Sequence, residues 1–85
     1  MPRFHFHLTD HEDRPDADGT DLPNAAACRP EAADLFAQRL KDYGPKFWET
    51  KEWSLNVTDE DGLTLFRMYL MVVDGALRGP ANSRN

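Results

Sequence analysis

The first stretch of the chain alternates between apolar and polar side chains. Three apolar residues share one side of an extended backbone: Phe4, Phe6 and Leu8. The residues between them put His5 and His7 on the opposite side. A period of two is typical of a strand with one buried face. We therefore predict a first strand over residues 3–8, a polar loop over 9–19 that ends in Asp-Gly, and a short second strand at 20–22.

A helix is predicted next, between Asn24 and Gly44. Mostly apolar side chains recur at three- and four-residue steps, which line one helical face: Ala32, Leu35, Phe36, Arg39, Leu40 and Tyr43. Asn24 is a good N-cap residue, whereas Pro30 would cost about 3 kcal/mol inside a helix. Two solutions stay open: a short turn at 24–28 before a helix that begins near Pro30, or one bent helix from Asn24. Gly44-Pro45 is predicted to end the helix.

Two more strands are predicted after a connection that carries Phe47 and Trp48. Residues 53–58 alternate again, and Asp-Gly at 61–62 predicts a hairpin turn. The strand from Leu63 to about Val73 differs because both of its faces are apolar. One face holds Phe66, Met68, Leu70 and Val72, and the other holds Leu63, Leu65, Tyr69 and Met71, interrupted by Arg67.

These elements predict an α+β fold, in which an antiparallel sheet of three to four strands packs on one amphipathic helix in the order β-β-α-β-β. We expect a single domain over residues 1–74. Residues 75–85 have little to bury, so we expect a disordered, flexible tail.

The two-sided last strand is the strongest functional indication. A strand that is apolar on both faces is covered on both faces, and one helix covers only one. A second copy, another protein or the chain's own tail must cover the other; in the last case the segment after Tyr69 would turn helical and fold back through Leu70, Val73 and Leu77. Exposed apolar patches mark interaction sites. We therefore expect a homodimer or a complex with another protein, and five contact residues: Leu65, Tyr69 and Met71, with Phe47 and Trp48 at the rim.

Composition narrows the function classes. The chain has 10 basic and 15 acidic side chains and a net charge of −5, which argues against a nucleic-acid partner. The longest apolar run, residues 69–73, is far shorter than the roughly 20 residues of a membrane helix. Cys28 is the only cysteine, which excludes a multi-cysteine zinc site, and with no export signal it predicts a cytoplasmic protein.

Several short motifs resemble one known family. They are Met1 to Leu8 with Asp10, the run from Asp18 to Asn24, the Ala-rich helix, and Trp53-x-Leu55-x-Val57-Thr58-Asp59 with Gly62. In their order and spacing, over residues 1 to about 70, the chain is similar to the small bacterial proteins of domain of unknown function 6894. The resemblance implies a small cytosolic α+β domain and no particular activity, because the family has no established reaction. This chain departs from the family at His5, where an aromatic is usual, at Pro30, and in its longer, more apolar last strand.

A transition-metal site is the alternative function. His5 and His7 share a strand face, and Asp10 and His11 follow in the loop. Imidazole and carboxylate ligands suit zinc. The competing interpretation is a solvated polar face, with no cofactor.

Catalysis has little support in the sequence. A nucleophilic site could be built only from Cys28 with His7 and Asp10, and a cysteine among alanines at a helix start is expected to be a buried thiol. We therefore expect a binding or regulatory module that is not an enzyme.

Overall fold

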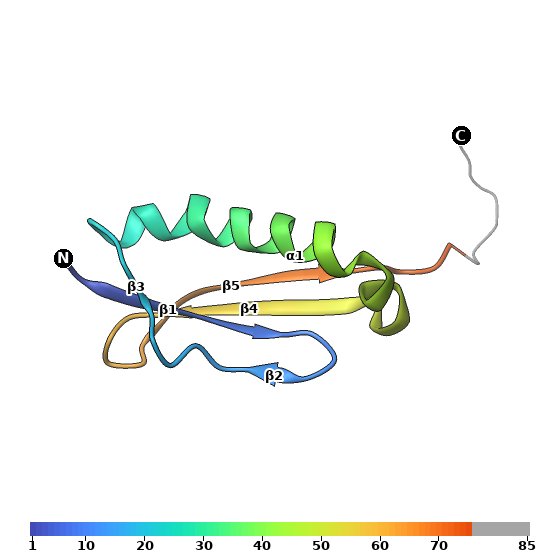
Figure 1. The fold of residues 1–85 in the computed structure, drawn as a ribbon, viewed down its shortest axis with the longest axis horizontal. Coiled ribbons are helices and arrows are strands. Elements are labelled where there is room, and N and C mark those ends of the chain that lie inside the picture. The colour runs from blue at the N-terminus through green and yellow to red at the C-terminus, as the bar shows by residue number, and fades with distance from the viewer. Residues whose placement is uncertain (76–85) are drawn as a thin grey trace.

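The computed structural model describes residues 1–75 and has two layers, a sheet and one long helix on one of its faces (Figure 1). The strands are β1 (Arg3–Thr9), β2 (Asp13–Arg14), β3 (Thr20–Asp21), β4 (Glu52–Thr58) and β5 (Thr64–Met71). Before β4 come a short 3-10 turn, η1 (Ala25–Ala27), and the helix α1 (Cys28–Thr50). The predicted α+β class is confirmed. The sheet has five strands rather than three to four, because the loop after β1 adds the two-residue strand β2.

The sheet is antiparallel, and its main strands lie in the order β2-β1-β4-β5, with β3 also paired to β1. β1 and β4 are therefore central, and β5 forms one edge. The pairing sets His7 opposite Asn56 and Asn56 opposite Arg67, so these residues form one row across the sheet. A β-bulge interrupts the β4–β5 pair at Leu65, which has no residue opposite it on β4. On either side of the bulge, Thr64 pairs with Thr58, and Phe66 pairs with Val57.

The hydrophobic core lies between α1 and one face of the sheet, which we call the helix face. The sheet contributes Phe4, Phe6, Trp53, Leu55 and Val57, and the helix contributes Cys28, Ala32, Phe36 and Phe47, all of them buried. The alternation in the sequence therefore predicted the buried sides of β1 and β4. We call the opposite side of the sheet the open face, because the described residues place no second layer on it.

The helix begins with a separate turn, as the first of the two predicted solutions requires. Asn24 caps η1, and its side-chain oxygen accepts a hydrogen bond from the Ala27 amide at 3.0 Å. α1 then starts at Cys28, so Pro30 lies in its first turn. Amides in the first turn have no partner within the helix, and a proline there costs little.

The predicted end of the helix at Gly44-Pro45 is wrong. Tyr43 leaves the helical conformation (φ −131°, ψ 27°), and a second helical segment then continues to Thr50. Gly44 and Pro45 open this segment, where a proline is favourable because no amide hydrogen bond is needed. Lys51 ends α1 in the left-handed conformation (φ 61°) and leads directly into β4.

β5 keeps an extended conformation to its end, so the fold-back alternative is wrong for Leu70 and Val73. Just past β5, the Val72 amide donates to the Lys51 carbonyl at 2.9 Å, and Lys51 forms an ion pair with Asp74 at 2.7 Å. Leu77 and the expected flexible tail, apart from Gly75, lie outside the described residues.

Candidate functional site

The open face carries a polar centre on β1 and β4 and an apolar margin on β5. Its central residues include His7, Asn56 and Thr58. The Arg67 guanidinium donates to the Asn56 side-chain oxygen at 3.2 Å, and His7 Nε2 lies 3.3 Å from the Thr58 hydroxyl. A shallow hollow of about 590 Å³ lies along this row and reaches Arg14 in β2. The polar centre is therefore hydrogen-bonded across the strands.

Asp16 fixes the two strand histidines from the loop before β3. Its carbonyl lies 2.8 Å from His5 Nδ1, and its amide donates to His7 Nδ1 at 3.0 Å. Its carboxylate accepts hydrogen bonds from the amides of Phe6 and Gly19. Burial alone would raise the pKa of Asp16, but these amides and the two histidines lower it. The imidazole rings stack 5.9 Å apart and nearly parallel.

The four predicted metal ligands are divided between two clusters. His5 and His7 contact Asp16, whereas Asp10 and His11 lie in the turn between β1 and β2. Over residues 1–75 no three side chains of His, Cys, Asp or Glu are arranged to hold a metal ion. The loop instead holds His5 and His7 in a backbone clamp, formed by the carbonyl and the amide of Asp16.

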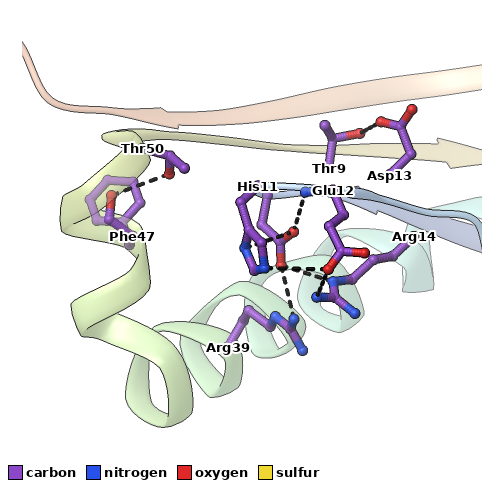
Figure 2. Close-up of polar contacts among 9 residues, drawn as sticks. Thr9, His11, Glu12, Asp13, Arg14, Arg39, Phe47 and Thr50 are labelled. Carbon is purple, nitrogen blue, oxygen red and sulfur yellow. Dashed lines mark hydrogen bonds and ion pairs between the residues drawn. The ribbon is translucent and has the colours of Figure 1, made fainter.

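Asp10 is a buried carboxylate that joins the β1–β2 turn to α1. It accepts hydrogen bonds from Arg39 on α1 at 2.8 Å, from Arg14 at 3.0 Å and from the Glu12 amide at 2.9 Å. Figure 2 shows Arg39 reaching from α1 toward the β1–β2 hairpin, which carries His11 in its turn and Arg14 in β2. Burial alone would raise the pKa of Asp10, but these donors outweigh it and lower the pKa to about 2.

Cys28 is separated from the other members of the nucleophilic set. Its side chain is fully buried in the core, on the helix face. His7 lies on the open face, with the sheet between them. Burial, and secondarily Glu31, raises the pKa of the Cys28 thiol. The structure therefore does not bring Cys28 and His7 together.

The apolar margin of the open face consists of Tyr69 and Met71, followed by Val73; we call these three residues the β5 patch. Tyr69 is 58% exposed, Met71 54% and Val73 78%. Leu65 does not belong to this patch. The bulge places it against the core, where it lines a hollow of about 360 Å³ beside η1.

The two predicted rim aromatics have different environments. Phe47 is only 4% exposed and packs edge-on against Trp53, with ring centroids 5.2 Å apart, so it belongs to the core rather than to an exposed rim. Trp48 is 60% exposed on α1, and its ring lies 5.8 Å from that of Phe47. Because α1 continues past Pro45, Phe47 points inward from a helix rather than lying on a loop.

The comparison with protein families decides the membership of the chain. The model described as Domain of unknown function (DUF6894) matches residues 3–71. The chain belongs to this family. No curated protein and no solved structure matches it. The match covers every helix and strand of residues 1–75, from β1 to the end of β5, so the DUF6894 domain comprises the two-layer unit that the structure describes.

Two residues of this DUF6894 domain organise the structure in ways that the sequence pattern did not predict. Asp16 and Asp10 both lie in the stretch that was predicted only as a polar loop, residues 9–19, yet each is the centre of a hydrogen-bond cluster. The spacing of Asp16 and Gly19 was the available signal, since aspartate commonly accepts hydrogen bonds from amides a few residues ahead.

None of the helices over residues 1–75 combines the length and apolar character of a membrane span.

Proposed function

We propose that this protein is a small non-catalytic binding or regulatory module that acts through protein contacts and forms a homodimer through β5. The observation that carries the proposal is the β5 patch. Tyr69 and Met71 are more than half exposed on the open face, while α1 covers the other side of the sheet. Tyrosine and methionine are enriched where protein interfaces are fully buried.

The surroundings of the patch support a protein partner. Ser54 lies opposite Tyr69, and Glu52 lies opposite Met71, so polar side chains border the apolar margin on its β4 side. An apolar centre with a polar rim is the usual composition of a protein interface. Asp10 and Cys28 are buried titratable groups, and the contacts of each stabilise the fold: Asp10 holds the β1–β2 turn to α1, and Cys28 packs in the core. These contacts support a module that acts by binding.

We also place this module in the cytoplasm. Cys28 is a free, fully buried thiol, and this burial raises its pKa. A protein that is stabilised by packing and carries an unpaired cysteine suits a reducing compartment.

The molar mass in solution tests this proposal. We expect the native chain to have twice its monomer mass by light scattering at micromolar concentration, and Tyr69→Asp or Met71→Asp to have the monomer mass. Leu35→Asp is the matched control, because Leu35 is also an exposed apolar residue, 40% exposed, but lies on α1. A native chain that is monomeric at every concentration would contradict the homodimer. Loss of the dimer in Leu35→Asp but not in Tyr69→Asp would move the interface to the helix.

A further inference from the structure

The outer edge of β5 has backbone groups at defined positions that find no partner strand among residues 1–75. In an antiparallel pair, successive residues bond alternately to one neighbouring strand and to the other side. Val72 donates to Lys51, which extends the register of Met71 opposite Glu52, so the even-numbered residues of β5 bond toward β4. The N–H and C=O groups of the odd-numbered residues Arg67, Tyr69 and Met71 therefore point away from the sheet.

The same alternation is confirmed independently at the other side of the sheet. It predicts that the Phe6 amide points away from β4, and this amide donates to the Asp16 carboxylate at 3.1 Å. At that edge β2 and β3 pair with the two ends of β1, and the Asp16 carboxylate accepts the Phe6 amide between them. No strand among residues 1–75 pairs with the outer edge of β5.

β5 also lacks most features that protect an edge strand from pairing. Edge strands that are protected from pairing are usually short, interrupted by proline, or rich in charged side chains. β5 is eight residues long and contains no proline. Arg67 is its one charged residue, so a single side chain limits which partner strand can lie alongside.

We propose that β5 pairs antiparallel with β5 of a second copy across a twofold axis, with Tyr69 directly opposite its own counterpart. This inference rests on the proposed homodimer and specifies its geometry. Arg67 of each copy lies opposite Met71 of the other. The two sheets join into one continuous sheet, because the twofold axis stands perpendicular to it, and both α1 helices lie on the same side.

The choice of register follows from the residues of β5. An axis at Arg67 sets two guanidinium groups directly opposite each other, which is destabilising. An axis at Met68 sets Met71 opposite Leu65, where the bulge interrupts the regular strand. An axis at Leu70 sets Arg67 opposite Val73, beyond the end of β5. Among these axes, only the one at Tyr69 pairs all three outward-facing residues, Arg67, Tyr69 and Met71, within the regular part of the strand. It also places no two like charges opposite each other.

The same register explains the partial burial of β5 on the helix face. α1 packs mainly on β4, and Met68 and Leu70 are only half-buried beside it. With Tyr69 on the axis, Met68 of one copy lies opposite Leu70 of the other. The pairing therefore covers apolar side chains on both faces of β5, as expected for a strand that is apolar on both sides.

Disulfide cross-linking tests the register. Tyr69→Cys places two thiols on directly opposed residues with Cα atoms about 5.5 Å apart, a distance that a disulfide spans. We expect this variant to form a covalent dimer on mild oxidation. Arg67→Cys is the matched control, because its counterparts lie about 13 Å apart along the strands and cannot be bridged. A mixture of Arg67→Cys and Met71→Cys should form the mixed covalent dimer. The native chain is the blank, since its Cys28 is fully buried.

A proline substitution tests whether the backbone makes the contact. Arg67→Pro removes an outward amide and leaves the bonds to β4, whereas Arg67→Ala removes only the side chain. Each dimer loses two hydrogen bonds in the proline variant. We therefore expect the dissociation constant of the dimer to be about tenfold higher for Arg67→Pro than for Arg67→Ala. Circular dichroism checks that both variants fold.

The outcomes separate this inference from the proposed function. A dimer in which Arg67→Cys cross-links to itself, or in which Tyr69→Cys does not cross-link, overturns the register while the homodimer stands. Equal dissociation of Arg67→Pro and Arg67→Ala overturns pairing through the β5 backbone. A native chain that is monomeric by light scattering overturns both proposals.

Discussion

At the scale of single residues, the Asp16 side chain accepts a backbone hydrogen bond that a neighbouring strand would otherwise accept from β1. β2 pairs with Leu8 and Thr9, and β3 pairs with Arg3 and Phe4, which leaves the Phe6 amide between them. The Asp16 carboxylate accepts that amide and the amide of Gly19. A single side chain therefore completes the edge of the sheet and also holds the loop that contacts His5 and His7.

Gly19 makes this arrangement possible, and its replacement should be costly. It has φ +76°, and a Cβ atom there would lie 2.8 Å from Arg3 Cγ and 3.0 Å from the Phe4 carbonyl oxygen. We predict that Gly19→Ala destabilises the fold by about 2–3 kcal/mol, because backbone strain adds to these contacts. The measurement is urea unfolding followed by tryptophan fluorescence.

Gly62→Ala is the control for backbone strain alone. Gly62 has φ +85°, but a Cβ atom there would meet no atom within 4 Å. This variant should lose about 1 kcal/mol. Equal losses in the two variants would show that crowding of the added Cβ atom against β1 costs no stability beyond the backbone strain.

At the scale of elements, Asp10 connects the β1–β2 turn to α1, and this connection should depend on pH. The pKa of Asp10 is lowered from 3.8 to about 2 by the fold, so folding favours the ionised form. This stabilisation is present above the unfolded pKa and is lost as the pH falls through the folded pKa. The shift corresponds to about 2 kcal/mol, lost between about pH 5 and pH 2.

Asp10→Asn tests this connection. We predict that the variant is about 2 kcal/mol less stable at pH 7, because the ion pairs with Arg14 and Arg39 are lost. It should also lose less stability than the native chain between pH 5 and pH 2. Asp34→Asn, an exposed change on α1, should behave like the native chain. The measurement is the free energy of unfolding in urea across this pH range; parallel pH curves for native and Asp10→Asn would refute the role of Asp10.

The sequence predicted the elements better than their junctions. Alternation identified β1 and β4 with their buried faces, because a half-buried strand requires it. The continuation of α1 past Gly44-Pro45 was missed, since the same dipeptide can end one helix or open the next. Leu65 was assigned to the wrong side because a bulge shifts the alternation, and no local signal in an apolar strand marks a bulge.

The candidate site was predictable only in part, for a related reason. The exposure of Tyr69 and Met71 follows from counting how many faces one helix can cover. The clamp around Asp16 depends on where a long polar loop returns to the sheet, and that path is set by the pairing of β3 with β1. The spacing of residues within the loop therefore does not predict that Asp16 lies beside His5 and His7.

At the scale of the whole molecule, the two-layer unit has little core for its length. Small domains bury a smaller share of their surface, and association is one common way to add stability. In this protein α1 lies over the centre of the sheet, and β5 retains half-buried side chains on one face and exposed ones on the other. Association through β5 would therefore contribute directly to folding stability.

Unfolding should consequently depend on protein concentration. For a dimer that unfolds to two chains, a tenfold increase in concentration stabilises the dimer by about 1.4 kcal/mol. The unfolding entropy of two chains of 85 residues converts this into a rise in Tm of about 4 °C. We predict this shift for the native chain by calorimetry, whereas the Tm of Tyr69→Asp should be lower and independent of concentration, because a monomer unfolds without a change in the number of particles. If the native Tm is constant over a hundredfold range of concentration while light scattering at 25 °C still shows a dimer, the dimer dissociates below the unfolding temperature, and the β5 contact does not contribute to the stability of the chain at its Tm.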